Sequence, residues 1–595
     1  MKIKKLAFCA VTVCMLTFTA VAQDDWDGGW DDSGTESSDD GFGSFDDSGS
    51  DSLIGFGSSA SGSAITFSGR LTFDGRYYFA KDDSEYFRTS YMSFDSENLR
   101  FLQERRLTTM IRWNDTYPDV YNLTDQKKRY FDDLGYREVD YDDNEIATIP
   151  AARLGVAYSG NKADASLSLN LTKQTLRKYQ EDIIDEMILR GYFFDNRFTV
   201  EAGKMKVVWG KGDKLHVLDN FNADDYTDFI IPDYIDRRIS TPMLRLAYSF
   251  PTKAPLSVEA LWTPFLPTDR FATEGVWTPA AYAKLSYLTQ SIIAWDYTRG
   301  TMLASDVSSF ETDDLFPNTH NIRYSQGGFK VGGTVAALDW GVSYYIGRYK
   351  QPSVNLDKTV TPIQTCLLYK AAAKQYLELA EKAANAGDAA AAANYATLAT
   401  NSATAATNAL NYIGLPSLDY DRKQTVGLEF AAVLGRFNLR GEAGYNLTND
   451  MAGDDPWVHN NSIQWLFGFD FDLPISNLNV NIQETGTYIL GSNNIKDWDF
   501  AEYDVDYDPE SRYTNDKLVV NISDSWLNDR LKPELTFLWG LERGDFVFQP
   551  KLTYAPNPYV SFSLSGVMIH AKDEYSEFYA WKNNNFVNFG VKLEF

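Results

Sequence analysis

Residues 210–239 hold the side chains whose types and spacing are best suited to chemistry. The stretch is rich in aspartate and ends in Arg237-Arg238, and a strand-like run with Arg245 on its polar face follows it. Opposed carboxylates and guanidinium groups inside a pore would create a transverse field that orders polar solutes as they pass. The stretch therefore predicts a constriction loop, with these acidic members: Asp213, Asp219, Asp224, Asp225 and Asp228.

Two other interpretations of the same aspartates stay open. A solvated outer loop balanced by local ion pairs would have the same composition. Carboxylates are also hard oxygen ligands that suit Ca²⁺, but the chain has no twelve-residue Ca²⁺ loop. We therefore expect neither a metal ion nor another cofactor.

Residues suited to catalysis are sparse. The chain has four histidines, and none of them stands in a metal-ligand spacing such as H-E-x-x-H. His570 ends a strand-like run in which Ser561, Ser563 and Ser565 share the opposite face, which argues against a Ser–His pair there. We expect a non-enzymatic protein, because a membrane-embedded hydrolase would need a triad assembled across strands.

Strict alternation predicts the strands that would position the charged groups. From residue 66 to residue 79 the odd positions are apolar, aromatic or glycine, and the even positions are mostly polar. A charge on a lipid-facing position costs roughly 2–4 kcal/mol near the bilayer midplane, so the even positions must face a water-filled lumen. The predicted pore-lining residues are Arg70, Asp74, Arg76, Arg237, Arg238 and Arg245.

The last eleven positions, 585–595, alternate in the same way up to Phe595. A strand at the end of a chain has an open edge, and in a closed barrel it would pair with the first strand and remove that edge. The alternative is an ordinary edge strand. The ending resembles the C-terminal signature of Gram-negative-type outer-membrane barrel proteins. That resemblance implies contact with the barrel-assembly machinery through the strand that ends at Phe595.

Composition and the first residues restrict the compartment. Residues 1–22 have a lysine-rich start, a short apolar run and an Ala20-Val21-Ala22 site, which predicts a cleaved signal peptide. Residues 23–63 are rich in Asp, Gly and Ser and predict a disordered acidic periplasmic tail, with a tether or a weak Ca²⁺ or chaperone contact as the alternative. The net charge is −27, which excludes nucleic acid as a partner.

Turn and loop lengths predict the topology. Tight turns are expected near 104–106, 160–162, 195–196, 251–254, 289–290, 338–339, 434–436, 474–477 and 555–558. Long outer loops are expected between them, among them 173–186, 210–239, 448–461, 491–515 and 572–584. Because outer-membrane barrels pair short periplasmic turns with long outer loops, residues 64–595 predict an all-β transmembrane antiparallel barrel. We count 22 candidate strands and keep 16 to 22 as the range, with both termini periplasmic.

An alanine-rich insertion, 366–411, interrupts this pattern with helical spacing. Asn385-Ala386-Gly387-Asp388 breaks the run, and Asp388 is placed to cap a second helix. We predict a helical hairpin in an outer loop. It would serve either as a receptor knob or lid, or as a decoration without chemistry.

One stretch also resembles a known family. Gly203-Lys204-Met205-Lys206-Val207-Val208-Trp209-Gly210 ends a strand, an aspartate follows, and then the turn Phe221-Asn222-Ala223-Asp224. This order is similar to the DUF1302 outer-membrane family and, more loosely, to alginate-export porins, although the family's proline is missing from the turn. The resemblance implies a barrel of the export or porin type and supplies no substrate.

These observations favour an outer-membrane channel that passes small polar or amphipathic solutes by diffusion, with 210–239 as its gate. The expected partners are outer-membrane lipid and a small-molecule solute. The alternative is a surface adhesin or structural barrel whose outer loops bind a partner. A receptor with a folded N-terminal plug is disfavoured, because only the acidic tail precedes the first predicted strand.

Overall fold

The computed structural model describes most of residues 146–595 and three segments before them. The predicted signal peptide, the acidic tail at 23–63 and the turn at 104–106 lie outside the described residues. The described residues are 64–79, 90–92, 136–138, 146–213, 215–228, 234–272, 277, 279, 281–282, 285, 289, 292–293, 312–497, 501, 504–573, 575–582 and 584–595.

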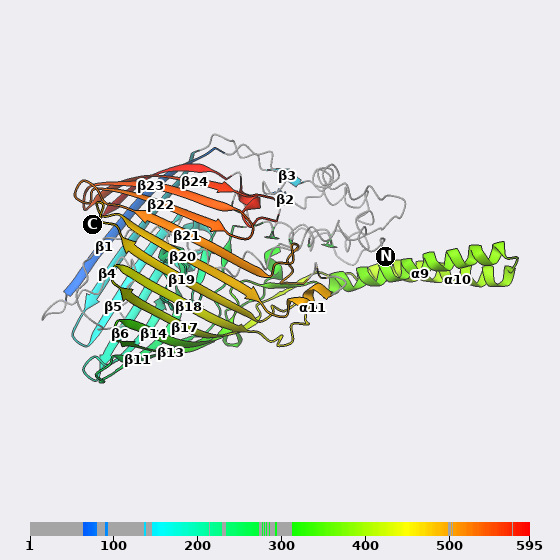
Figure 1. Ribbon diagram of the computed structural model, residues 1–595, viewed down its shortest axis with the longest axis horizontal. Helices are drawn as coiled ribbons and strands as arrows, with labels where there is room; N and C mark the ends of the chain where they lie inside the picture. Colours follow the sequence, from blue (N-terminus) through cyan, green and yellow to red (C-terminus); the bar gives the residue numbers. More distant parts are fainter. Residues whose placement is uncertain are drawn as a thin grey trace.

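Eighteen strands form one closed antiparallel barrel (Figure 1), which confirms the predicted fold class. Each strand pairs with the next barrel strand along the chain, and β1 closes the ring by pairing with both β4 and β25. The strands are β1 (Ala64–Tyr78), β4 (Ile146–Ser159), β5 (Ala163–Thr172), β6 (Ile184–Phe193), β7 (Phe198–Met205), β10 (Thr241–Phe250), β11 (Leu256–Thr263), β13 (Gln326–Val335), β14 (Leu338–Arg348), β17 (Arg422–Leu434), β18 (Phe437–Leu447), β19 (Ser462–Asp472), β20 (Asn479–Ile489), β21 (Thr514–Ser523), β22 (Leu531–Gly540), β23 (Phe546–Asn557), β24 (Val560–His570) and β25 (Phe586–Glu594).

The chain end closes the barrel, as its alternation predicts. In the β1–β25 register Leu71 lies opposite Leu593 and Phe73 opposite Val591. The backbone of Phe595 also exchanges two hydrogen bonds with that of Gly69, at 2.8 and 2.9 Å. Because every barrel strand has a partner on both sides, the barrel sheet itself has no unpaired edge.

The strand number lies inside the predicted range but below the 22 candidates. The difference comes from two predicted hairpins, around 104–106 and around 289–290. The ladder has no place for strands from either, because β1 pairs directly with β4 and β11 pairs directly with β13. The remaining predicted turns match the structure within three residues: β13 and β14 are joined at 336–337 instead of 338–339, and β23 and β24 at 558–559 instead of 555–558.

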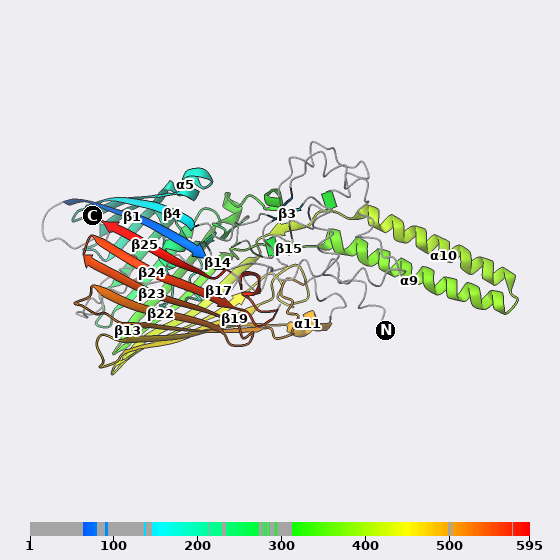
Figure 2. The ribbon, with the colours of Figure 1, turned by 90° about the horizontal axis from the view of Figure 1, so that it is seen from above.

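The two faces of the barrel wall differ as alternation requires. Large apolar side chains such as Phe67, Phe73, Leu428 and Phe589 are exposed on the outside. Polar and charged side chains face inward and are buried there, and Arg76 is only 3% exposed. Short connections join the strands at one end, which we call the turn end, and mostly longer ones, apart from 541–545, join them at the other, the loop end (Figures 1 and 2).

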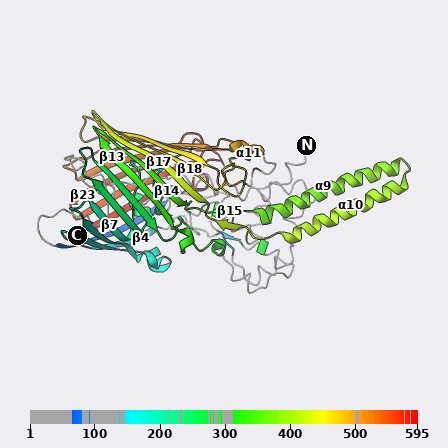
Figure 3. The ribbon, with the colours of Figure 1, turned by 90° about the horizontal axis from the view of Figure 1, so that it is seen from below.

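A helical hairpin extends from the loop end, away from the barrel, in all three views (Figures 1 to 3). Its helices are α9 (Asp357–Asn385) and α10 (Ala389–Ala409), and the Asp388 side chain caps α10 by accepting from Ala391 N at 3.0 Å. The break is therefore where the sequence predicts it. At 1.5 Å per residue, α9 is about 43 Å long.

The hairpin begins nearer the barrel than the predicted residue 366. Pro362 lies inside α9 and has no N–H to donate to the carbonyl of Lys358, four residues earlier. The backbone N–H of Gly414, from the returning chain, donates to that carbonyl instead at 3.0 Å. A contact distant in sequence thus allows the helix to continue through the proline.

The remaining elements are short and lie in the connections. No helix among the described residues is long and apolar enough to cross a membrane. These elements are β2 (Ser90–Met92), β3 (Tyr136–Glu138), β8 (Ala223–Tyr226), β9 (Arg238–Ile239), β12 (Arg270–Phe271), β15 (Ser353–Asn355), β16 (Ser417–Asp419), α5 (Lys173–Arg177), α6 (Tyr234–Arg237), α11 (Ser492–Asp497) and the 3₁₀ turns η2 (Gln180–Ile183), η3 (Thr312–Leu315), η4 (Ile322–Tyr324), η5 (Leu410–Tyr412) and η7 (Tyr579–Trp581).

Candidate functional site

The connection from β7 to β10 folds into the barrel. We call residues 206–240 the inner segment; the structure describes it except at 214 and 229–233. Its residues Leu215, Val217 and Leu218 are buried in one apolar cluster with inward-facing side chains of the distant barrel wall. Those wall residues are Leu466 on β19, Val519 on β21, Leu538 on β22, Val547 on β23, Val567 and Ile569 on β24 and Phe586 on β25.

Asn222 joins the entry and exit of the inner segment. Its side-chain oxygen accepts from Val207 N at 2.8 Å, and its amide nitrogen donates to Met205 O and Ile239 O at 3.0 and 2.9 Å. The side chain is 3% exposed, so all three bonds are shielded from water. Asn222 thereby holds together the two points at which the segment leaves and rejoins the wall.

An aromatic group anchors the segment beside the strands it leaves. Trp209 packs edge-to-face on Phe221, with ring centroids 4.9 Å apart, and Phe221 packs in the same way on Tyr345 of β14 at 5.2 Å. The indole N–H of Trp209 donates to Glu259 Oε1 on β11 at 2.7 Å. The polar atom of this buried ring is therefore satisfied, as burial of a tryptophan requires.

Glu442 on β18 holds the segment from the far side. Its Oε1 accepts from the backbone N–H groups of Lys211 and Gly212, both at 2.6 Å, and its Oε2 accepts from those of Val217 and Leu218 at 2.8 and 3.1 Å. Such converging N–H groups form a binding site for an anion, and here the anion is a side chain of the wall.

Gly210 explains why the backbone can approach Glu442 so closely. It has φ +122°, and a Cβ atom built there would lie 2.3 Å from Glu442 Oε1. A side chain at this position would combine backbone strain with a clash against the carboxylate. The glycine is therefore required both for the conformation and for the contact.

Two aspartates of the segment bind the basic wall formed by β1 and β4. Arg76 donates from Nη1 and Nη2 to the two carboxylate oxygens of Asp228 at 2.7 and 2.9 Å. Asp236 accepts a hydrogen bond from Arg153 on β4 and lies 4.0 Å from the Nη1 of Arg70. Such paired guanidinium–carboxylate contacts are among the stronger polar contacts in proteins.

The inner segment is thus held on both sides of the lumen. Glu442 lies five strands along the sheet from β10, and Arg76 lies four strands from β7 in the other direction. Burial would raise the pKa of Asp236, but the nearby charges, with Arg153 contributing most, outweigh burial and hold that pKa below its ordinary value. The carboxylate therefore stays ionised at neutral pH.

Two other predicted constriction-loop residues bind single basic partners. Asp213 Oδ1 lies 3.2 Å from Arg440 Nη1 on β18, and Asp225 Oδ2 accepts from Arg270 Nη1 at 3.1 Å. Arg270 belongs to β12, which pairs with β8 of the segment. These pairs connect the segment to the wall and to its neighbouring loop.

Asp219 and Asp224 bind within the segment itself. Asp219 forms a buried ion pair with Arg238, and Asp224 Oδ1 lies 3.9 Å from Arg237 Nε and 4.0 Å from Arg238 Nε. Arg237 and Arg238 are 1% and 4% exposed. The structure therefore places these two predicted pore-lining residues inside the packing of the segment.

The other predicted pore-lining residues lie on the inner wall. Arg245 on β10 donates to Glu201 Oε2 at 3.2 Å and to Glu259 Oε2 at 2.8 Å. Asp74 on β1 accepts from Asn588 Nδ2 at 2.9 Å. Both side chains lie on the inner wall of the barrel. That they contact a passing solute stays a prediction.

Sequence reasoning missed two wall residues that hold the segment. Arg153 and Glu442 were not named as site residues, yet the side chains of both bind the inner segment, Arg153 at Asp236, an aspartate of the predicted loop 210–239. Arg153 alternates with Leu154 and Tyr158 on β4, which is the signal that placed Arg70 inside. The same alternation argument, applied to every strand, finds Arg153 and Glu442, but it cannot reveal what they bind.

The electrostatic arrangement differs from the predicted opposed rows. Acidic and basic groups are interleaved and paired between segment and wall, so much of each charge is neutralised locally. The aspartates therefore belong to a segment that is packed inside the barrel, as the constriction-loop interpretation requires, and they form ion pairs, as the alternative interpretation requires. Among the described residues, no group of three or more His, Cys, Asp or Glu is arranged to hold a metal ion.

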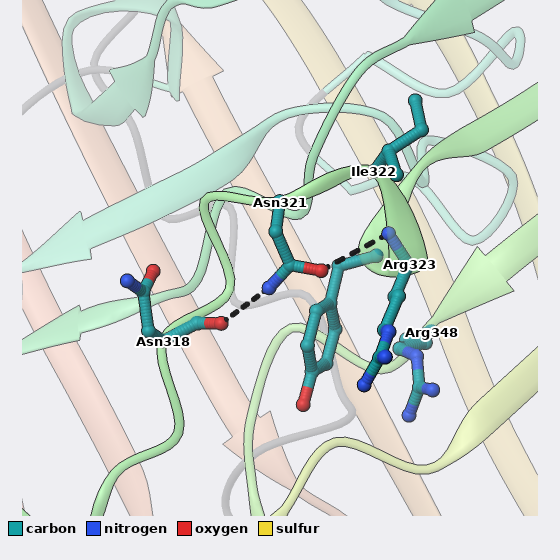
Figure 4. A pocket seen from close by; sticks show the side chains of 6 residues that line it. Asn318, Asn321, Ile322, Arg323 and Arg348 are labelled. Atoms are coloured by element: carbon teal, nitrogen blue, oxygen red, sulfur yellow. Dashed lines mark hydrogen bonds between the residues drawn. The ribbon is translucent and has the colours of Figure 1, made fainter.

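A separate open recess lies in the connections at the loop end (Figure 4). It has a volume of about 650 Å³ and is lined by Asn318, Asn321, Ile322, Arg323, Tyr324 and Arg348. The guanidinium carbon of Arg348 lies 4.5 Å from the centre of the Tyr324 ring. The recess thus offers cationic and aromatic surface in a strongly acidic chain.

Comparison with known proteins gives neighbours among solved structures only. No family model and no curated protein matches the chain, so the resemblance to the DUF1302 family stays a prediction. OccAB4 of Acinetobacter baumannii is 8% identical with TM-score 0.37, over 90% of this chain and 98% of that chain. OprB of Pseudomonas putida is 7% identical with TM-score 0.33, over 90% and 94%. OmpF of Salmonella typhi is 7% identical with TM-score 0.31, over 89% and 97%.

Proposed function

We propose that this chain is an outer-membrane channel that passes small polar or amphipathic solutes by diffusion, and that the inner segment is its gate. The observation that carries the proposal is the position of that segment. It crosses the inside of a closed barrel and is held to opposite walls by side chains. A segment held in this way obstructs passage when docked and admits it when released.

The barrel wall supports placement in a membrane. Its outer face carries exposed apolar and aromatic residues on successive strands, including Leu154, Leu428 and Leu564. All strands are paired, so no backbone donor or acceptor of the ladder would face lipid unsatisfied. Outside the apolar cluster that packs on the inner segment, the inward face carries many polar side chains, which suits water and hydrophilic solutes.

The contacts that hold the gate are suited to release. Those on the β1 side are ion pairs with a partly exposed carboxylate, which salt or a competing charged solute weakens more than it weakens a fully buried contact. The pair between Arg76 and Asp228 also has a partly exposed member, since the Asp228 side chain is 28% exposed. Water can therefore reach this pair and replace it.

Replacing Asp228 by asparagine tests the gate. The change leaves the buried Arg76 without its carboxylate, which costs about 1–3 kcal/mol in the docked state. We expect the open fraction in planar bilayers to rise roughly tenfold to a hundredfold, since 1.4 kcal/mol corresponds to a factor of ten. Lys253→Gln, which changes one charge in an exposed turn at the other end, should conduct like the unmodified protein.

An absence of conductance would contradict the proposal. If the unmodified protein and Asp228→Asn both insert as folded barrels and show no conductance steps under any condition, the chain is not a diffusion channel. Conductance that is identical in the two proteins would retain the channel and remove the gate.

A second function is favoured by the helical hairpin. Helices α9 and α10 extend beyond the loop end, which is where a surface-binding protein would present its contact surface (Figure 3). Under this alternative the chain is an adhesin or structural barrel that binds a partner through its outer loops. Deleting 357–409 would then abolish binding to cells or matrix while leaving bilayer behaviour unchanged.

A further inference from the structure

Two connections at the loop end are joined by buried polar contacts. They are residues 448–461, between β18 and β19, and the described residues 490–497, 501 and 504–513 of the connection between β20 and β21. Asn460 N donates to Asp506 Oδ2 at 2.6 Å, Val505 N donates to Pro456 O at 3.0 Å, and Leu490 N donates to Asn461 O at 2.8 Å. We call this contact the loop junction.

His459 lies at the centre of the loop junction and is 5% exposed. Its Nδ1 lies 2.6 Å from Asp421 Oδ2, and its backbone N–H donates to the same oxygen at 2.9 Å. The imidazole also packs on the ring of Tyr349, with centroids 4.6 Å apart. The histidine therefore contacts residues that precede β17 and follow β14, in addition to its own loop.

The charge around His459 is mostly negative. Five aspartates of this region are at most 8% exposed. One of them, Asp508, pairs with Arg543, and the imidazole of His459 lies among the other four. Lys423 Nζ lies 4.9 Å from the centre of the Tyr349 ring, the same ring on which the imidazole packs. The titratable and charged groups of the region include Asp421 before β17 and Lys423 on it, Asp450 in the first connection, Lys496, Asp504, Asp506, Tyr507, Asp508 and Tyr513 in the second, Tyr349 after β14, and Arg543, which binds Asp508.

These surroundings shift the protonation of two groups in ways that act together. Burial would lower the pKa of His459, but Asp506, Asp421 and Asp504 outweigh it and raise that pKa above 6.5. Burial raises the pKa of Asp504 from 3.8 to about 8, and the charges of Asp506 and Asp450 add to the effect. The joined state therefore holds the protons of both His459 and Asp504 more tightly than separated, solvated loops would.

The signs of the two shifts agree. His459 stabilises the joined state fully below its ordinary pKa of 6.5, and that contribution is lost as pH rises through its raised pKa. Asp504 keeps its proton more tightly in the joined state, so this state loses stability as pH rises from its ordinary pKa of 3.8 through about 8. Both groups weaken the loop junction as pH increases.

The loop junction is also continuous with the inner segment. Tyr349 N donates to Asp421 O at 3.0 Å. The next residue, Lys350, donates from Nζ to Phe221 O of the inner segment at 3.2 Å and also bonds Gln326. A movement of the loops can therefore reach the gate through one short stretch of chain.

We propose that the loop junction is a pH-dependent latch at the outer mouth, joined when His459 is protonated and Asp504 is neutral and released when both have lost their protons. The latch rests on the proposed channel function for its effect on solute passage. The change in the loops themselves does not depend on that function. It can be measured in the folded barrel whether or not the protein conducts.

Backbone hydrogen exchange of the full chain in detergent, at pH 6 and pH 9 and corrected for the intrinsic pH dependence of exchange, tests the latch. We expect protection of 448–461 and 504–513 to fall at least tenfold at pH 9, while β17 to β19 keep theirs. His459→Gln, which cannot be charged, should show reduced protection already at pH 6, and Asp504→Asn should retain protection at pH 9. His570→Gln, at an exposed position at the end of β24, should behave like the unmodified protein.

The two proposals fail in different ways. Equal protection of both loops at the two pH values, with His459→Gln unchanged, overturns the latch even if the protein conducts. A pH-dependent loss of protection in a protein that never conducts retains the latch and overturns the channel. Conductance that rises from pH 6 to pH 9 in the unmodified protein, and is already raised at pH 6 in His459→Gln, supports both.

Discussion

Replacing Glu442 by alanine is expected to release the inner segment from the β18 wall. The carboxylate accepts four backbone N–H groups, from Lys211, Gly212, Val217 and Leu218. Each buried donor left without an acceptor costs about 1–3 kcal/mol, so the docked state loses several kcal/mol. The barrel ladder is unaffected, because Glu442 contributes its side chain to the lumen and its backbone to the sheet.

Two measurements check this expectation. Single-channel recordings should show a raised open fraction or a larger conductance, by an order of magnitude or more. Limited proteolysis should show new cleavage after Lys211 in a barrel that still migrates as folded. Glu484→Ala is the matched control, since Glu484 on β20 bonds the Trp465 indole on the outer face. If Glu442→Ala leaves both recordings and proteolysis unchanged, the four N–H bonds do not hold the segment.

Replacing Leu428 by arginine should destabilise the barrel strongly. Leu428 lies midway along β17 and is 56% exposed on the outer face. A guanidinium group at the bilayer midplane of such a barrel costs about 2–4 kcal/mol. The denaturant midpoint in lipid vesicles should fall accordingly, because this midpoint scales with the free energy of unfolding at constant slope.

The same substitution at Leu434 provides the control. Leu434 is the last residue of the same strand and is 58% exposed, so residue type, strand and exposure are matched and only depth differs. Near an interface the cost falls to about 0–1 kcal/mol. Equal losses at the two positions would mean that the exposed apolar face does not meet a membrane interior.

Local pattern alone was enough for the strands and their faces. Alternation placed Arg70 and Arg76 inside and Phe73 outside, and the run ending at Phe595 identified the closing strand. The break between the two helices of the insertion could also be predicted, because Gly387 and the capping Asp388 determine the conformation of residues next to them in sequence. These features follow from periods of two and 3.6 residues, which a short window of sequence contains in full.

The number of strands and the path of the inner segment were decided by the tertiary structure. Apolar runs around 289–290 resemble strands, but the ladder closes without them. Asp228 binds Arg76 across 152 positions, and Glu442 meets the segment more than 220 positions away. The loop junction likewise joins His459 to residues from separate connections. Such pairings leave no local period in the sequence, because they depend on which walls a closed barrel brings face to face.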